Sequence, residues 1–191
     1  MQLKRATHKA IKYACMNYHY AKALPAVSVG YSVFNKKNEW CGCILFGGGA
    51  NYKLGAKFGL VAGQFMELTR MALNGKQEST SKAMAIAIRL IKKQAPLVRM
   101  LFSYADKGQN HLGTIYQATN WYFIEESKSS GYEVLIAGEW RHDRILANKD
   151  RSKYLKRKKS GKYKYVFPLD KKLILECNKI KKKYPKNAIK V

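Results

Sequence analysis

Residues 103–121 read SYADKGQNHLGTIYQATNW, and this stretch predicts the class of fold. The apolar residues from Val98 to Ser103 are typical of a buried strand, and a helix with one apolar face is expected from Leu112 to Tyr116. Between them lies a loop with three side chains able to do chemistry: Asp106, Gln109 and His111. A sheet fixes the backbone while a loop at the end of a strand exposes side chains, so this loop is a candidate site. An ordinary connection with a solvated Asp and His has the same pattern.

The composition indicates a globular and strongly basic chain. Its 191 residues are enough for one domain with a sizeable core, and 47% of them are hydrophobic. Lys and Arg number 37 against 12 Asp and Glu, a net charge of +25. Such a charge opposes compaction and is typical of a protein whose partner is a polyanion, so nucleic acid is expected first and an acidic membrane second. We find no run of 18 apolar residues and no signal peptide pattern, and we expect a cytoplasmic protein without a membrane span.

The apolar patterns predict a single α/β domain over residues 1–191, with no internal repeat. Helices are expected over residues 7–18 and from 78–81 to 93, and strands over residues 27–34, 39–46, 64–73, 98–103, 132–137, 163–169 and 173–175. A polar turn joins the first two of these strands, which predicts an antiparallel hairpin.

In two of the predicted strands, the spacing of residues predicts on which side of the sheet their side chains lie. Glu67 and Arg70 lie three apart, so on a regular strand they face opposite sides of the sheet. Cys41 and Cys43 alternate and should face the same side as small apolar fillers. The four cysteines are too scattered for a metal knuckle.

The C-terminal part, from about residue 141 to 191, is the most basic. It holds nineteen Lys and Arg but only four Asp and Glu. Tyrosines among the cations are typical of a surface that grips a nucleic-acid backbone and stacks exposed bases, while a solvated charge run is the ordinary alternative. The DNA-binding candidates here are Lys156, Arg157, Lys158, Lys159, Lys162 and Lys164.

Several motifs share their order with a known family. They are SYAD at 103–106, GxxYQATNW from Gly113 with His111 just before it, His19-Tyr20-Ala21-Lys22 with Pro25, Glu67-Leu68-Thr69-Arg70, and Gly138 followed by His142 and Arg144. Over residues 17–186 the chain thereby resembles the phage Mom family of DNA-modification proteins, which share a fold with the GNAT acyltransferases. The resemblance implies a GNAT-like mixed central sheet flanked by helices, in a protein of the bacterial host cytoplasm. It adds His142 and Arg144 to the DNA-binding candidates.

The resemblance also implies a reaction on double-stranded DNA: a carbamoylmethyl (glycinamide-type) group is placed on N6 of adenine. Such a group covers the major-groove donor that restriction enzymes read. Because N6 is a poor nucleophile inside the base stack, the enzyme needs a flipped base and a proton acceptor, for which Asp106 is the first candidate. The catalytic candidates are Asp106, His111, His19, Tyr20, Ser103 and Tyr104. The substrate- and donor-binding candidates are Glu67, Arg70, Ser79, Ser81, Gly113, Thr114, Tyr116, Gln117, Asn120 and Trp121.

The donor is not fixed by the sequence. GNAT enzymes present backbone amides at a helix start to the pyrophosphate of acetyl-CoA, but here only Gly75 precedes Lys76, Gln77 and Glu78, which departs from that pattern. An acyl or aminoacyl donor, acetyl-CoA or a glycine-derived group, stays open. His19, Tyr20 and Asp106 could also ligate iron or zinc. The alternatives are an N-acetyltransferase acting on a protein or small molecule, and a non-enzymatic DNA-binding antirestriction protein.

Overall fold

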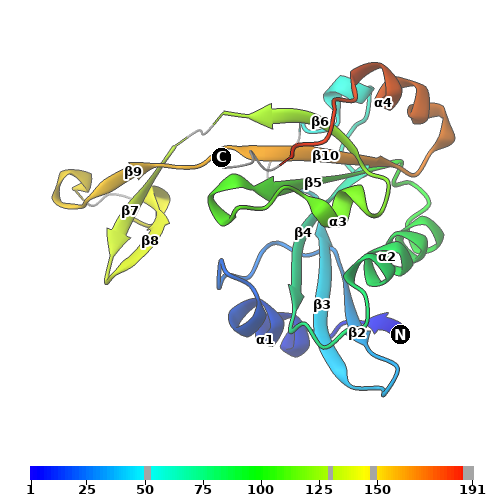
Figure 1. Ribbon diagram of the computed structural model, residues 1–191, viewed down its shortest axis with the longest axis horizontal. Coiled ribbons are helices and arrows are strands. Elements are labelled where there is room, and N and C mark those ends of the chain that lie inside the picture. Colours follow the sequence, from blue (N-terminus) through cyan, green and yellow to red (C-terminus); the bar gives the residue numbers. More distant parts are fainter. Residues whose placement is uncertain (50–52, 129–130, 147–149, 187–191) are drawn as a thin grey trace.

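A seven-stranded mixed sheet forms the centre of the fold, in the strand order β1-β2-β3-β4-β5-β10-β6 (Figure 1). The computed structural model describes residues 1–49, 53–128, 131–146 and 150–186. The strands of this sheet are β1 Gln2–Arg5, β2 Val29–Phe34, β3 Trp40–Gly47, β4 Phe65–Leu73, β5 Met100–Asp106, β6 Tyr122–Ser127 and β10 Lys162–Pro168. The α-helices are α1 His8–Tyr18, α2 Thr80–Gln94, α3 Thr114–Gln117 and α4 Ile174–Ile180. The sheet and helices confirm the expected α/β class.

Helices cover both faces of the sheet. On one face α1 buries Ile11, Ala14 and Cys15 against strands β3 and β4. On the other face α2 supplies a buried row from Ala83 to Ile91 that packs against β2, β3 and β5. A third cluster packs α4 and the 3-10 turn η1 (Ala56–Phe58) around Phe102. Apolar residues thus flank the sheet on both sides, as its near-continuous apolar strands require.

The sheet splits in its middle, between β4 and β5. These strands pair in parallel only where Phe65–Glu67 meets Met100–Phe102. Beyond that point β4 stays with β3 and β5 stays with β10, so the two strands diverge. Ser103 holds the branch point, because its Oγ hydrogen-bonds to the Leu68 carbonyl oxygen (3.2 Å) and to the Tyr116 hydroxyl (2.8 Å). The divergence opens the sheet at the strand ends that carry the polar motifs.

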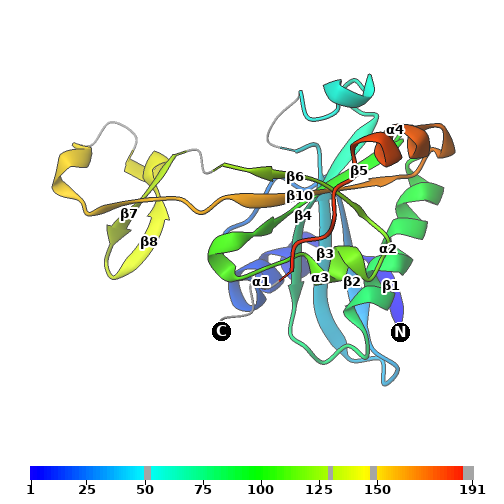
Figure 2. The same cartoon turned by 45° about the horizontal axis from the view of Figure 1, so that its top comes forward.

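A second sheet stands away from the body, and we call it the arm (residues 131–159; Figures 1 and 2). Its strands are β7 Tyr132–Ile136, β8 Glu139–His142 and β9 Lys156–Lys158, in the order β8-β7-β9, with the short turns η3 Asp143–Leu146 and η4 Arg151–Lys153. Val134 and Leu146 form its small interior. On one face the Arg157 guanidinium lies 4.4 Å from the centre of the Trp140 ring, and its Nε donates to Glu133 (2.7 Å).

Two expectations about the strands were wrong. Residues 173–175 are helical, because the Asp170 side chain accepts from Lys172 N and starts the turn η5 (Lys171–Leu173) that runs into α4. Cys41 and Cys43 are buried free thiols, as expected, but they lie in different clusters, Cys41 with α2 and Cys43 with α1. The cause is the irregularity at Gly42, whose φ of 116° breaks the alternation.

The expected helix over 7–18, the hairpin and the strands at 64–73, 98–103, 132–137 and 163–169 are confirmed within a few residues. Within the described part of the chain, no helix is both long and apolar enough to cross a membrane.

Candidate functional site

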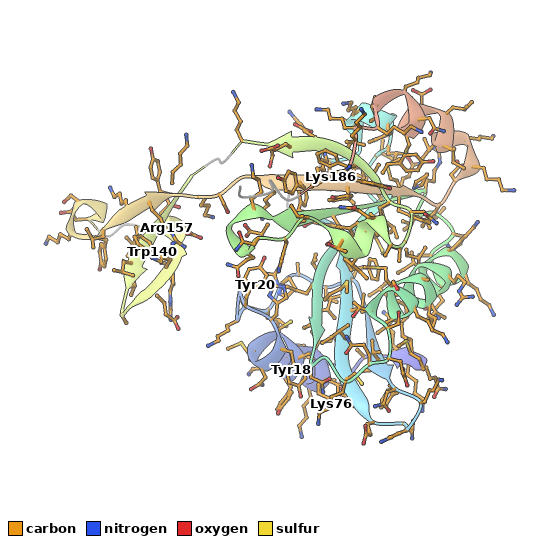
Figure 3. All side chains as sticks on the ribbon, in the orientation of Figure 1. Tyr18, Tyr20, Lys76, Trp140, Arg157 and Lys186 are labelled. Atoms are coloured by element: carbon orange, nitrogen blue, oxygen red, sulfur yellow. The ribbon has the colours of Figure 1, made fainter. Side chains whose placement is uncertain are left out.

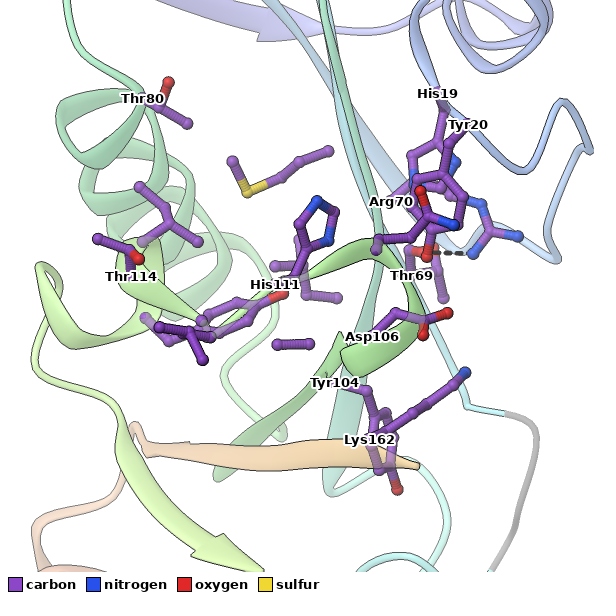
Figure 4. Close-up of a pocket in the computed structure, with 18 of the residues that line it drawn as sticks. His19, Tyr20, Thr69, Arg70, Thr80, Tyr104, Asp106, His111, Thr114 and Lys162 are labelled. Carbon is purple, nitrogen blue, oxygen red and sulfur yellow. Dashed lines mark hydrogen bonds between the residues drawn. The ribbon is translucent and has the colours of Figure 1, made fainter. Parts of the chain in front are cut away.

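A pocket of about 700 Å³ occupies the opening where β4 and β5 diverge (Figure 4). Its walls come from both faces of the sheet: the segment after α1, the ends of β4 and β5, the start of α2, and the loop into α3. The polar side chains that line it are Tyr18, His19, Tyr20, Glu67, Thr69, Arg70, Thr80, Tyr104, Asp106, Gln109, Asn110, His111, Thr114, Tyr116 and Lys162. The pocket therefore passes through the sheet at the split.

His19 and Tyr20 reach the pocket because α1 ends just before them. The His19 Nδ1 atom accepts a hydrogen bond from Ala21 N (3.1 Å), and its ring stacks on Tyr20 with centroids 4.4 Å apart. Burial, the Arg70 charge and His111 together lower the pKa of His19 to about 4. The ring is therefore neutral near pH 7, and with Nδ1 accepting, its proton sits on Nε2.

Asp106 is the last residue of β5 and is held by two donors. Its Oδ1 accepts from Gly108 N (2.9 Å) and from the Ser160 hydroxyl (2.8 Å). The Asp106 carbonyl oxygen accepts from His111 N (3.1 Å), which folds the loop back toward the end of β5. His111 in turn lies edge-on to Tyr20, with ring centroids 5.9 Å apart.

The two tyrosines beside this carboxylate keep their protons at neutral pH. Burial and then the charge of Asp106 raise the pKa of Tyr20. Burial and then the charge of Glu67 raise the pKa of Tyr104 to about 12. Both hydroxyl groups are therefore protonated near pH 7.

Glu67 and Arg70 both line the pocket and face the same side of the sheet, which corrects the expectation that they face opposite sides. The register of β4 against β3 shifts between Leu45 and Phe46, so β4 carries one extra residue, Thr69. Leu68 and Met71 both pack toward α2, and the residue before each of them therefore points the other way. Arg70 Nη1 donates to the Thr69 carbonyl oxygen (2.7 Å), while Nε is buried with no partner among the described residues.

Some predicted residues lie outside the pocket. Trp121 is fully buried against Tyr116 and Phe167, so it does not stack a base. Ser103 is buried at the branch point, and Ser79 caps α2 by accepting from Lys82 N (3.1 Å). The predicted residues that do not line the pocket are Ser79, Ser81, Ser103, Gln117, Asn120 and Trp121, whereas Gly113, Thr114 and Tyr116 do line it.

Sequence reasoning missed several polar contributors, among them Thr69 and Thr80, and it did not place Lys162 at the pocket. Thr69 lies inside the Glu67-Leu68-Thr69-Arg70 motif and enters the pocket wall with its neighbours. Thr80, at the first position of α2, has no sequence signal that sets it apart. Lys162 was expected on DNA alone, but it pairs with Asp106 across β5 and β10, a neighbour relation that only the strand register reveals.

Comparisons with known proteins show the family and the fold of this chain. The model of the Mom protein family matches residues 1–186. The chain belongs to the Mom family. It is 33% identical over 121 residues to the methylcarbamoylase Mom of Escherichia phage Mu, a match that covers 56% of this chain and 49% of the Mu protein. The match thus spans about half the length of that relative.

The solved structures that resemble this Mom family chain are GNAT acetyltransferases. One is the spermidine/spermine N-acetyltransferase SpeG of Vibrio cholerae, with a TM-score of 0.54, 7% identity and coverage of 91% of this chain and 95% of SpeG. Another is an acetyltransferase of Bacillus subtilis in complex with CoA, with a TM-score of 0.52, 8% identity and coverage of 87% and 97%. A third is a GNAT family acetyltransferase of Bacillus anthracis, with a TM-score of 0.51, 10% identity and coverage of 87% of this chain and 93% of that protein. These likenesses establish the GNAT fold.

The start of α2 does not fit the pyrophosphate of a CoA donor in the way described for GNAT enzymes. The Ser79 hydroxyl already accepts from the amide of Lys82, and the Glu78 carboxylate lies next to it, accepting from Lys36 N. A carboxylate and a side-chain cap at this helix end oppose the approach of another anion. We derive no step through coenzyme A for this Mom family chain.

A metal set is equally unsupported by the side-chain geometry. His19, Tyr20 and Asp106 lie around one pocket, but His19 Nδ1 and Asp106 Oδ1 are engaged by protein donors. A metal on His19 would have to displace the Nε2 proton and lose the Nδ1 acceptor. Within the described residues no group of three His, Cys, Asp or Glu side chains could hold a metal ion. No step below uses a metal.

The basic candidates for DNA contact divide into different kinds. Lys156 and Lys158 are exposed and share one face of β9, while Arg157 between them is paired with Glu133 and stacked on Trp140. Lys164 is half-buried, and burial lowers its pKa. The side chains of His142 and Arg144 lie outside the described part of the structure. Lys156 and Lys158 are thus the best-placed cations of the arm.

Proposed function

We propose that this chain is a DNA-modifying transferase that adds a carbamoylmethyl group to N6 of adenine in double-stranded DNA. The observation that carries the proposal is that residues from four of the five motifs that resemble the Mom family line a single pocket, at the split of the sheet. The similarity to the Mu methylcarbamoylase supports the reaction class, and the GNAT fold supports a transferase.

An adenine must leave the duplex to enter this pocket. Flipping costs a few kcal/mol, which contacts of the basic surface with the phosphates offset. A pocket of about 700 Å³ is in the size range of small-molecule sites, so it can hold a base together with a small donor group. Because residues of both faces line it, the base and the donor can enter from opposite sides of the sheet.

Asp106 is the residue that we assign as general base. In the transfer step a bond forms between N6 and the donor carbon, while the bond between that carbon and its leaving group breaks. The N6 proton passes to Asp106 Oδ2, the carboxylate oxygen that has no hydrogen-bond partner among the described residues. A base placed this way removes the positive charge that would otherwise build up on N6.

His19, Tyr20 and Arg70 act on the donor in this assignment. Neutral His19 offers its Nε2–H and Tyr20 its O–H, so both donate hydrogen bonds instead of taking the N6 proton. The Arg70 guanidinium, with a buried Nε that lacks a partner, stabilises negative charge that develops on the donor carbonyl or leaving group.

The arm and the neighbouring end of β10 supply the DNA grip. Lys156 and Lys158 project from the arm, and Lys162 extends this basic surface to the rim of the pocket. Figure 3 places Trp140 and Arg157 on the arm, on the same flank of the molecule as Tyr20. A duplex held by the arm would pass the mouth of the pocket.

Mass spectrometry of nucleosides tests the proposal. DNA from cells that express the chain is digested and compared with DNA from cells that carry the empty vector. We expect a deoxyadenosine heavier by one carbamoylmethyl group, in the expressing cells alone. Unmodified deoxyadenosine from a folded, expressed protein that binds DNA would instead favour a non-enzymatic antirestriction protein. Unmodified DNA together with saturable acetyl-CoA binding in calorimetry would favour an N-acetyltransferase.

A further inference from the structure

A second hollow, of about 590 Å³, lies on the outer side of α1 between β1, β2 and the start of β3, and we call it the aromatic groove. Its lining residues are Lys4, Arg5, Thr7, Lys9, Ala10, Tyr13, Tyr18, Ser32, Phe34 and Trp40. Tyr18 lines this groove and the central pocket, because it ends α1 directly before His19. The two hollows therefore share Tyr18, which Figure 3 labels.

Three aromatic rings form the floor of the groove. Tyr13, Tyr18 and Trp40 lie in mutual contact, with every pair of ring centroids 5.7 Å apart. Trp40 Nε1 donates to the Ser32 hydroxyl (3.2 Å), which fixes the orientation of the indole. The floor is thus a preorganised set of rings.

The packing of α1 does not account for Tyr13, whereas Tyr18 and Trp40 are partly buried and pack against the cluster that holds the helix. The helix is held to the sheet by Ile11, Ala14 and Cys15, which are buried in the interface with β3 and β4. Tyr13 is instead 53% exposed. An exposed ring that stands against two packed rings, and that the core does not need, is available to stack a planar ligand.

The rim of the groove is cationic. Lys4, Arg5 and Lys9 are exposed, and no Asp or Glu is among the residues that line the groove. The contacts found for these cations are to neutral groups: Lys4 Nζ lies 5.3 Å from the Phe34 ring centre, and Arg5 donates to the Ser28 carbonyl oxygen (3.3 Å). Aromatic faces beside unneutralised cations select a planar ligand that carries negative charge.

We propose that the aromatic groove binds one unpaired nucleotide, with its base against Tyr13 and Trp40 and its phosphate held by Lys4, Arg5 and Lys9. Nucleotides combine a flat ring with an anion, and the volume admits one of them but no duplex. The ligand is a free mononucleotide or a nucleotide of a single-stranded segment, and the two share this chemistry. Binding here needs no reaction in the central pocket.

Tryptophan fluorescence can report on the groove directly. The chain has three tryptophans, of which Trp121 is fully buried and Trp140 is in the arm. In a Trp140→Phe background, quenching by a ligand therefore reports on Trp40. The probes are AMP, a single-stranded dodecanucleotide and the matching duplex, each titrated at several salt concentrations.

We expect saturable quenching by AMP or by the single strand, and a weaker response to the duplex. Tyr13→Ala should weaken the affinity for the quenching ligand by roughly 5- to 100-fold, the range for loss of one stacking ring, while Tyr13→Phe should retain the affinity. Lys9→Glu should also weaken the affinity, and the affinity should then depend less steeply on the salt concentration. Equal affinity for AMP and the oligonucleotide assigns the site to a free nucleotide, and much tighter, salt-dependent oligonucleotide binding assigns it to a strand.

Three results would overturn the proposal. They are no quenching by AMP or the single strand, quenching unchanged in Tyr13→Ala, and a change of oligomeric state in Tyr13→Ala, which would make the groove an interface between copies. Repeating the titration with Asp106→Asn separates the groove from the reaction, because quenching should persist there whether or not DNA is modified.

Discussion

Replacing Asp106 by Asn should distinguish the role of this residue in the reaction from its role in the stability of the fold. Asp106 Oδ1 accepts hydrogen bonds from Gly108 N and Ser160 Oγ, and an asparagine keeps an oxygen in that place. The change converts charge-assisted hydrogen bonds to neutral ones, so we expect a stability loss of about 1 kcal/mol. The base at Oδ2 disappears, and the rate of modification should fall roughly 100-fold or more, equivalent to about 2.7 kcal/mol of barrier.

Three measurements on the same purified variant distinguish these effects. The fraction of modified deoxyadenosine in digested DNA measures the reaction, a gel-shift titration measures DNA affinity, and urea denaturation measures stability. A carboxylate that accepts a proton in the transition state does not contribute ground-state affinity, so the gel shift should match the wild type. His111→Ala should lose less activity if this histidine orients the donor, and as much as Asp106→Asn if it relays the proton.

Ser160→Ala is the matched control. It removes one hydrogen bond to Oδ1 but leaves the carboxylate and its charge, so its stability cost should be similar while its activity stays within a few-fold of wild type. The reasoning fails if Asp106→Asn modifies adenine at the wild-type level, or if it loses activity only by failing to fold. The base would then have to be sought at Glu67.

Three further outcomes are expected. Replacing Lys156 and Lys158 together by Ala should weaken DNA binding to all sequences alike. The slope of log affinity against log salt should become shallower by up to about 1.8, because each phosphate contact contributes about 0.9. An unchanged slope would mean that the DNA binds elsewhere on the protein. In an NMR titration His19 should protonate near pH 4 instead of 6.5, and Arg70→Gln should raise that pKa only partly, because burial is the larger cause. Since the folded-state pKa of His19 is depressed, its contribution to stability is full above pH 6.5 and is lost as the pH falls toward 4. Ser103→Ala should destabilise the fold by about 1–3 kcal/mol in urea denaturation, because it leaves a buried carbonyl and a buried hydroxyl unpaired; a neutral substitution would mean that the branch point is not held there.

The parts of the site that follow from local patterns could be predicted from the sequence. The helical spacing before His19 and Tyr20 places them at a helix end, and the apolar run before Asp106 places it at a strand end. Both features depend only on short-range periodicity, and the resemblance to the Mom family brought them together.

The parts that depend on neighbours in space could not be predicted. The extra residue at Thr69 reverses the facing of Arg70, and it arises from the register of β4 against β3. Trp121 has an aromatic ring of the kind that stacks on bases, but its packing against Tyr116 and Phe167 buries it. Lys162 reaches the pocket through its pairing with Asp106 across two strands that are far apart in sequence.

The arm has a consequence for how proteins of this architecture can diversify. It grows out between β6 and β10, which are antiparallel neighbours paired as far as Ser127 and Lys162. In topological terms the whole arm is the loop of one hairpin, and a short turn could close the same two strands. A single insertion or exchange at that tip would therefore replace the surface proposed to hold DNA and leave the pocket residues in register. Ser160, which directly follows the arm, connects it to the central pocket by donating a hydrogen bond to Asp106 Oδ1. The grip on DNA can thus change as one exchangeable segment, while the residues of the central pocket stay as they are.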